Sequence, residues 1–182
     1  MRKFRVESSG LASHGFPGQK GPPKMPSQTE KSETFRSLHK EGCFLIANPW
    51  DVGSARILQG LGFKALATTS AGFANSQGVS DYHVTRDMVL AHARALCGAT
   101  SVPVSADLEN GFGDKPDDCA ETIGLAADAG LAGGSIEDFA GGGKGQYEIA
   151  HARDRIAAAV EAARALPFTF TLTARAEIFF TG

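Results

Sequence analysis

After Gly42 the sequence repeats one unit: a short apolar run, a Gly-rich or polar turn, and a segment with helical periodicity. The runs are CFLIANP (43–49), KALATTS (64–70), VPVSADLE (102–109), GGSIEDF (133–139) and FTFTLTARAE (168–177). Each run is short enough to be a strand that is buried on both faces. Strands that alternate with helices predict an α/β fold built on a parallel sheet.

Two architectures fit this alternation, an open doubly wound sheet and a closed barrel, and both place ligand sites at the carboxyl ends of the strands. Polar residues and one tryptophan lie at or just after the C-terminal ends of all five runs: Asn48, Trp50, Asp51, Thr68, Thr69, Ser70, Asp107, Glu109, Glu137, Asp138, Arg175 and Glu177. A doubly wound sheet concentrates its site at one switch point, whereas a barrel draws on many strands around one mouth. Contributions from five strands favour the (β/α)8 TIM barrel.

The stretch SADLENGFGD places two carboxylates, Asp107 and Glu109, at the end of one buried run. Carboxylates that converge without His or Cys form a hard oxygen site, which Mg²⁺ or Mn²⁺ prefers. Two buried carboxylates without such a cation would be costly. The alternative is that both residues cap the next helix or pair with a lysine, but further acidic residues at the next strand end, Glu137 and Asp138, favour the metal site.

The composition narrows the range of partners. The 182 residues include 18 basic and 20 acidic side chains, a net charge of −2, and we find no basic cluster, so we expect a small-molecule partner and no nucleic acid. With 42% hydrophobic residues and no apolar run near the N-terminus, we expect neither a membrane protein nor a secretory signal. Cys43, Cys97 and Cys119 are far apart and lack metal-ligand spacing, which indicates a reducing, cytoplasmic location.

A change in composition marks the start of the folded domain. Gly, Pro and Ser interrupt residues 8–28 repeatedly, and we expect residues 1–28 to form a disordered tail. The segment SQTEKSETFRSLHKEG predicts a short helix that is capped by Ser27 or Thr29 and ends at Gly42. Residues 29–182 are then expected to form a partial TIM-barrel catalytic domain.

The residues from Cys43 to Gly182 resemble the isocitrate lyase and phosphoenolpyruvate mutase superfamily. Within it they are most similar to proteins described as carboxyvinyl-carboxyphosphonate phosphorylmutase-like or methylisocitrate lyase-like. The segments that carry the resemblance, in the superfamily's order, are NPWDVGSARILQGLGFKALATTSAG, GVSD, SADLENGFG, SIEDF and LTARAE. The resemblance implies a barrel, a bound Mg²⁺, and lyase or mutase chemistry that breaks or makes a C–C or P–C bond of a 2-oxo acid or its enolate.

The same resemblance implies a role for each matching residue. Asp107 matches the metal-binding aspartate, and Asp81, Glu109 and Glu137 match acidic residues that hold the metal through water. Thr69, Ser70 and Ala71 match the loop that binds the substrate carboxylate. Arg175 matches the arginine that faces the developing oxyanion, so Arg175 and Glu137 are the expected catalytic residues. Trp50 is expected either to lie over the substrate or to plug the barrel mouth.

The loop after the fourth run departs from the superfamily pattern. Lyases carry a cysteine there, within a Lys-Lys-Cys-Gly-His motif, and the mutases and phosphonopyruvate hydrolases have a longer loop with an asparagine. This chain has AGGGKGQYEIAHARD, without either residue. The loop is either a mobile lid or an ordinary flexible turn, and the departure leaves the substrate open.

Five runs end near Glu177, whereas a complete barrel typically takes about 250 residues. The sequence therefore predicts only about the first five βα units, a C-terminally truncated barrel with an unpaired strand edge. Such an edge predicts aggregation or pairing with another chain, and we expect a homo-oligomer. An alternative function is that of a truncated, inactive family member that acts at most as an interaction fragment.

Overall fold

The structure, a computed structural model, describes residues 25–178. In chain order its elements are α1 (Gln28–Leu38), α2 (Val52–Gly60), β1 (Leu66–Ala67), α3 (Ser70–Ser76), α4 (Arg86–Ala99), β2 (Val104–Asp107), α5 (Pro116–Asp128), β3 (Gly133–Glu137), α6 (Ile149–Ala165) and β4 (Thr171–Arg175). Most of the predicted tail lies outside the described residues, and Gln28 is already the first residue of a helix.

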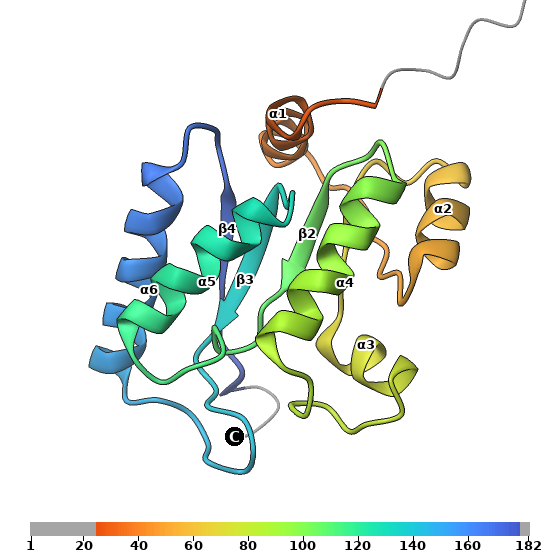
Figure 1. Cartoon of the computed structure of the whole chain (residues 1–182). Helices are drawn as coiled ribbons and strands as arrows, with labels where there is room; N and C mark the ends of the chain where they lie inside the picture. The colour runs from red at the N-terminus through yellow and green to blue at the C-terminus, as the bar shows by residue number, and fades with distance from the viewer. Residues whose placement is uncertain (1–24, 179–182) are drawn as a thin grey trace, which may run out of the picture.

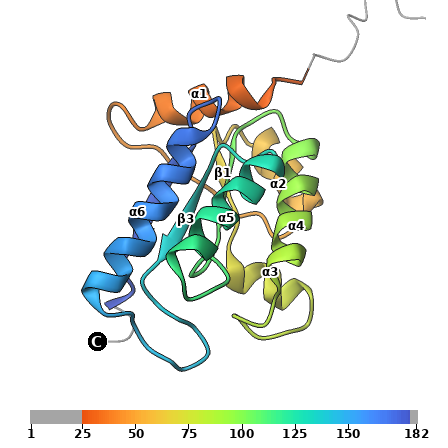
Figure 2. The same ribbon diagram turned by 60° about the vertical axis from the view of Figure 1, so that its left-hand side comes forward.

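The four strands form one parallel sheet in the order β1-β2-β3-β4. Helices α4, α5 and α6 lie together on one face of this sheet (Figure 1, Figure 2). A doubly wound sheet would reverse its strand order at a switch point, and the described strands follow the chain without reversal. The winding is that of a barrel wall, as the sequence predicted.

The two faces of the sheet differ in chemistry because successive side chains of a strand point to opposite faces. Val104, Ala106 and Ile136 face the helices and are buried in the main hydrophobic core. The strand register pairs Asp107 with Ser135 and Glu137 with Arg175 on the other face. That inward face, the inside of the barrel wall, is therefore polar, with the acidic and basic residues gathered at the carboxyl ends of the strands.

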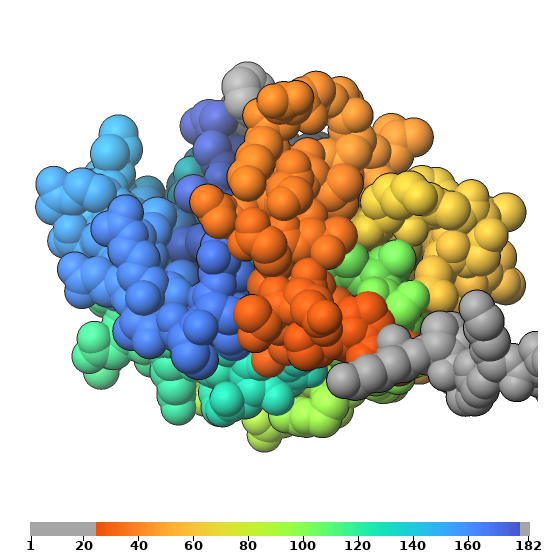
Figure 3. Space-filling view, turned by 90° about the horizontal axis from the view of Figure 1, so that it is seen from above, coloured from red at the N-terminus to blue at the C-terminus, as the bar shows by residue number. Residues whose placement is uncertain are grey.

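Helix α1 lies across the amino end of the sheet, where it covers the centre of the view in Figure 3. The predicted cap is confirmed, because Ser27 and Glu30 form a capping box. The Lys31 ammonium, buried beneath the helix, donates to the carbonyl oxygens of Cys97 at 2.8 Å and Thr100 at 2.6 Å. These contacts close the end of the sheet that is opposite to the polar site.

The first predicted strand, residues 43–49, does not form. Only Ala47 makes a single bridge, to Leu66 in β1. This segment has one neighbour, and its Leu45 is 76% exposed, so it lacks the packing on both faces that stabilises a buried strand. The next strand is also shorter than predicted, because Thr69 leaves the strand to cap α3.

No helix among residues 25–178 combines the length and the apolar character that crossing a bilayer requires.

Candidate active site

Asp107, the last residue of β2, is the centre of the polar cluster. Its Oδ1 accepts hydrogen bonds from Arg175 Nη1 at 3.1 Å and from the Glu109 backbone N–H at 3.2 Å. Its Oδ2 accepts from the Ser70 backbone N–H at 3.1 Å. The Asp107 backbone N–H donates to the Thr68 hydroxyl at 2.9 Å. Arg175 of β4, Glu109 in the loop after β2 and Ser70 at the start of α3 therefore fix the carboxylate.

Arg175, at the end of β4, faces three carboxylates. Its guanidinium lies 3.1 Å from Asp107, 3.6 Å from Glu137 and 2.6 Å from Glu177. Partial burial opposes the charged guanidinium, but Asp107, Glu137 and Glu177 together raise the pKa of Arg175. The Arg175 guanidinium therefore places a permanent positive charge on the inward face of the sheet.

Glu109 and Glu137 are buried carboxyl groups, with exposed fractions of 5% and 3%. Burial, followed by repulsion from Asp107, Asp81 and Glu137, raises the pKa of Glu109 to about 8. Burial also raises the pKa of Glu137 to about 7, although the Tyr82 hydrogen bond and Arg175 offset part of the effect. Perturbed carboxyl groups that gather in this way are typical of functional sites.

The cluster fits a divalent cation of the kind that prefers oxygen ligands. The Glu109 Oε1 atom is buried and has no hydrogen-bond partner, which is costly unless a cation or an ordered water satisfies it. Within residues 25–178 no group of three or more His, Cys, Asp or Glu side chains is placed to hold a metal ion by itself. Mg²⁺ commonly binds through one or two carboxylates and keeps several waters. The neighbouring carboxyl groups of Asp107, Glu109 and Glu137 suit such a cation.

The Asp81 carboxylate lies close enough to Glu109 to raise the pKa of Glu109. One of its own carboxylate oxygens accepts from the backbone N–H of Tyr82 at 3.1 Å. The four predicted metal residues come from three segments, Asp81 after α3, Asp107 and Glu109 at the end of β2, and Glu137 at the end of β3, and they meet at one end of the sheet.

The predicted substrate loop opens helix α3. The Thr69 side chain caps this helix, and Ser70 and Ala71 form its first turn beside Asp107. Thr69 also lines a cavity of about 360 Å³ together with Asp107 and Arg175. Trp50 differs from these residues. Its half-exposed ring lies against Gly72, and its carbonyl oxygen accepts from His92 Nε2 at 3.1 Å.

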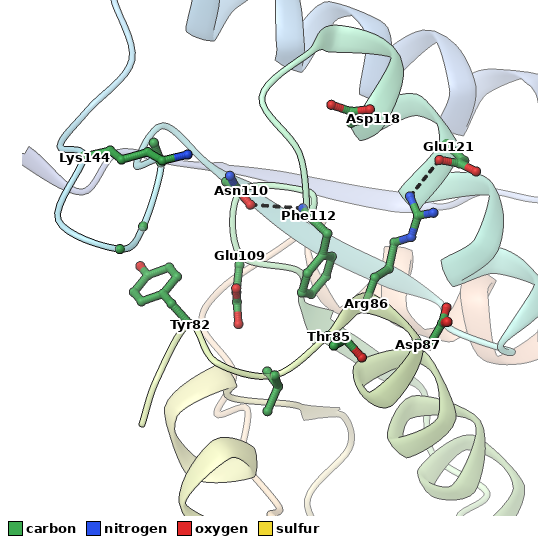
Figure 4. A pocket seen from close by; sticks show the side chains of 14 residues that line it. Tyr82, Thr85, Arg86, Asp87, Glu109, Asn110, Phe112, Asp118, Glu121 and Lys144 are labelled. Carbon is green, nitrogen blue, oxygen red and sulfur yellow. Dashed lines mark hydrogen bonds and ion pairs between the residues drawn. The ribbon is translucent and has the colours of Figure 1, made fainter. Parts of the chain in front are cut away.

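A second, larger cavity of about 650 Å³ is lined by Glu109 (Figure 4). Its walls come from the loop before α4, the first turns of α4 and α5, the loop after β2 and the glycine loop, which we define as residues 139–146 after β3. They include Tyr82, Arg86, Phe112, Gly141 and Lys144. The cavity lies beside the buried carboxylates and has the size of a small-molecule site.

Two residues that bear on this site were not predicted. Tyr82 donates its hydroxyl to Glu137 Oε1 at 2.6 Å. Arg155 of α6, only 1% exposed, donates to the carbonyl oxygens of Gly113, at 2.7 Å, and Asn110. Its guanidinium also lies 4.2 Å from the centre of the Tyr147 ring. Arg155 thereby holds the loop that carries Glu109. The sequence held one signal for this role, because Arg155 shares a helical face with the apolar residues Ala159 and Ala163.

The parallel sheet, with acidic residues and an arginine at its carboxyl edge, places the chain in the class of α/β barrel folds, whose functional sites lie at that edge. The phosphoenolpyruvate phosphomutase family matches residues 35–182. The chain belongs to this family, and its solved neighbours lie in the phosphoenolpyruvate mutase/isocitrate lyase superfamily, as the sequence motifs predicted.

Curated relatives match part of the chain. An uncharacterized protein of Mycobacterium tuberculosis is 39% identical over 107 residues, which are 58% of this chain and 40% of that protein. The 2-methylisocitrate lyase of Halalkalibacterium halodurans is 34% identical over 114 residues, which are 62% of this chain and 38% of the lyase.

Solved structures match more of the chain. A crystal structure of a lyase/mutase-type protein from Burkholderia cenocepacia shares 55% identity with a TM-score of 0.82, over 85% of this chain and 57% of that one. The structure of 2,3-dimethylmalate lyase shares 29% identity with a TM-score of 0.73, over 87% of this chain and 56% of that one. The chain therefore spans little more than half of these structures and about two fifths of the curated relatives.

Proposed function

We propose that the protein is a Mg²⁺-dependent lyase or mutase that breaks or makes a C–C or P–C bond of a 2-oxo acid or its enolate. The observation that carries this proposal is the meeting of Arg175 with the carboxylates of Asp107 and Glu137 at the carboxyl ends of adjacent strands, with the buried carboxyl group of Glu109 beside them. This arrangement combines a hard oxygen site with a fixed positive charge, which is what an enolate needs.

Mg²⁺, or Mn²⁺, would be held directly by Asp107 and through water by Asp81, Glu109 and Glu137. The bound cation would supply a Lewis acid for the substrate oxygens. The unpartnered Oε1 of Glu109 supports this assignment, because a water held by a cation would give that atom its missing hydrogen-bond donor.

The other site residues act on the organic substrate. Thr69, Ser70 and Ala71 bind its carboxylate at the start of α3, through the Thr69 hydroxyl and the backbone N–H groups that Asp107 does not already occupy. Arg175 stabilises the oxyanion that develops as the enolate forms, an interaction that lowers the barrier because it strengthens in the transition state. We place Glu137 with Arg175 as a catalytic residue, since its Oε2 lies 3.6 Å from the guanidinium. Trp50 shields the rim of this region.

Relatives are named for 2-methylisocitrate, 2,3-dimethylmalate and oxaloacetate. These acids, together with phosphonopyruvate, form the substrate panel that tests the proposal. Product formation is followed by proton and phosphorus NMR with and without Mg²⁺. Turnover of at least one compound only in the presence of Mg²⁺ is the expected result. If Mg²⁺ binds but no compound reacts, the alternative of an inactive family member is favoured instead.

Replacing Asp107 tests the cation site directly. We expect Asp107→Ala to abolish the thermal stabilisation that Mg²⁺ gives, because the mutation removes the direct ligand. The metal-free fold should persist, because the loss of one carboxylate also relieves repulsion among the remaining ones. Calorimetric Mg²⁺ titration measures the effect, with Asp154→Ala, an exposed aspartate on α6, as the matched control. An unchanged Mg²⁺ affinity in Asp107→Ala would show that the metal assignment is wrong.

The proposal also includes a cytoplasmic location and a homo-oligomer that acts on a small carboxylate. In support of the first, Cys43, Cys97 and Cys119 are all free thiols. The open edge of β4 supports the second, because this strand pairs with β3 on one side and with no other described strand.

A further inference from the structure

Tyr82 occupies an unusual position between two loops of the site. It follows Asp81 directly and has a φ of +61°, a left-handed conformation that an aromatic residue seldom adopts. This conformation accompanies a 2.6 Å hydrogen bond from its hydroxyl to Glu137 Oε1. The other oxygen of Glu137, Oε2, faces Arg175 at 3.6 Å. Tyr82 and Arg175 therefore hold the two oxygens of one buried carboxylate.

The ring of Tyr82 also supports the glycine loop. It makes an edge contact with Phe139, with ring centres 5.7 Å apart. At the buried Gly141, which has a φ of +69°, an added Cβ would lie only 2.7 Å from the Tyr82 ring. The loop can approach the ring this closely only because residue 141 has no side chain.

The glycine loop is a compact unit that can respond to this contact as a whole. The Ala140 N–H donates to the Gly145 carbonyl at 2.9 Å, and the Lys144 N–H donates to the Gly141 carbonyl at 3.0 Å. Its tip, residues 142–144, is exposed. Tyr82 and this loop border the same cavity as Glu109 (Figure 4).

We propose that Tyr82 is a positioning residue that couples the glycine loop to the Glu137 carboxylate. While the loop rests on the ring, the hydroxyl keeps Glu137 turned toward Arg175. When the loop moves away, the ring loses its support and Glu137 loses one of its two fixed contacts. This inference deepens the proposed function and rests on it only where Mg²⁺ binding is used as a readout.

The first test needs no cation and uses the rate of trypsin cleavage after Lys144, the lysine in the exposed tip of the glycine loop. Tyr82→Phe removes only the hydroxyl, and Gly141→Ala pushes the loop off the ring. We expect each substitution to speed cleavage about fivefold, the effect of losing roughly 1 kcal/mol of stabilisation. Gly142→Ala is the matched control, because that residue also has a positive φ, of +55°, but an added Cβ meets nothing within 4 Å.

The second test measures Mg²⁺ affinity by calorimetry in the same variants. Tyr82→Phe and Gly141→Ala should both weaken binding about fivefold, although residue 141 has no group that can bind a cation, and Gly142→Ala should leave binding unchanged. In a Tyr82→Ala background, Gly141→Ala should have no further effect on either readout beyond that of Gly142→Ala.

The two proposals fail in different ways. A wild-type chain that binds no Mg²⁺ overturns the proposed function, and the cleavage rates then decide the coupling alone. Wild-type cleavage rates in both Tyr82→Phe and Gly141→Ala overturn the coupling, even if Mg²⁺ binds. Equal effects of Gly141→Ala with and without the Tyr82 ring also overturn it. Circular dichroism of each variant shows whether the chain has kept its fold.

Discussion

Glu109 makes the stability of the metal-free protein depend on pH. The ordinary pKa of a glutamate is near 4.5, and folding raises that of Glu109 to about 8. Between these values the folded chain keeps a proton that the unfolded chain has lost, so the free energy of unfolding falls as the pH rises through this window. Glu137, with a pKa of about 7, acts in the same direction.

We therefore expect the melting temperature without metal to fall between pH 5 and pH 8. Glu109→Gln keeps the shape of the side chain without the charge. At pH 8 its free energy of unfolding should exceed that of wild type by at least about 1 kcal/mol, and its melting temperature by about 2–4 °C. Saturating Mg²⁺ should reduce the difference, because a cation favours the ionised carboxylate. Differential scanning calorimetry measures both effects. A wild-type melting temperature that stays constant over this range would contradict the burial argument.

Arg175→Lys separates charge from geometry. The substitution keeps a positive charge but replaces the planar fork that contacts Asp107 and Glu177 with a single ammonium. We expect turnover of the substrate identified in the panel to fall by about 10²–10³, the usual effect of losing one oxyanion donor. The ratio of kcat values measures this loss, and Arg164→Lys on the C-terminal turn of α6 is the control. Near-normal kcat would remove Arg175 from the catalytic residues.

The sequence identified some of these residues and missed others for physical reasons. Asp107 and Glu137 are the last residues of their strands, so simple alternation along a strand places them at the carboxyl edge. Tyr82 depends on a left-handed backbone conformation in a loop, which no periodic pattern reports. Arg155 depends on how α6 packs against a loop 42 residues earlier in the chain. Contacts of that kind are fixed by tertiary structure alone.

Helices, like single residues, differ in how well the sequence predicts them. Val89, Ala93 and Leu96 recur at helical spacing in the sequence, and all three are buried in α4. Helices α2 and α3 are short, and their caps, Asp51 and Thr69, were interpreted as polar residues at strand ends, Thr69 also as part of a substrate-binding loop. A cap and a ligand-binding residue have the same side chains, so local sequence cannot separate the two roles.

Helix α3 offers a test of how closely these elements pack. A Cβ at Gly72 would lie 2.5 Å from Trp50 Nε1 and 2.7 Å from Cγ2 of the cap Thr69. We expect Gly72→Ala to destabilise the protein by about 1–3 kcal/mol, because the cap or the ring must move. At Gly124, inside α5, an added Cβ meets nothing within 4 Å. Gly124→Ala should therefore stabilise by about 0.5–1 kcal/mol through helix propensity. Urea unfolding measures both, and equal effects would contradict the packing.

The molecule as a whole has one long side that its described elements leave uncovered. Strand β4 pairs only with β3 among residues 25–178. Beside it, between β4 and the end of α6, lies a groove of about 480 Å³ whose walls include Val160, Phe168 and Leu172. The inward face carries small hydroxyl residues, such as Ser105 and Thr173, so its exposure costs less than that of an apolar wall. The groove and the strand edge therefore dominate any tendency to associate.

The open edge of β4 presents backbone N–H groups to which another strand can bind. The Thr171 N–H donates to the carbonyl oxygen of Ala132, just before β3, so the alternation of backbone N–H groups turns that of Ala174 toward the open side. We expect the chain to self-associate through this edge. A lysine on an edge strand opposes pairing with another strand, as it does in natural proteins. Ala174→Lys should therefore weaken self-association about tenfold in dissociation constant, roughly 1.4 kcal/mol. Ala150→Lys, on the exposed first turn of α6, adds the same charge away from the edge and should leave association unchanged. Light scattering coupled to size-exclusion chromatography over a range of concentrations measures both variants. A wild-type chain that stays monomeric, or equal association of the two lysine variants, would show that the β4 edge is not the contact.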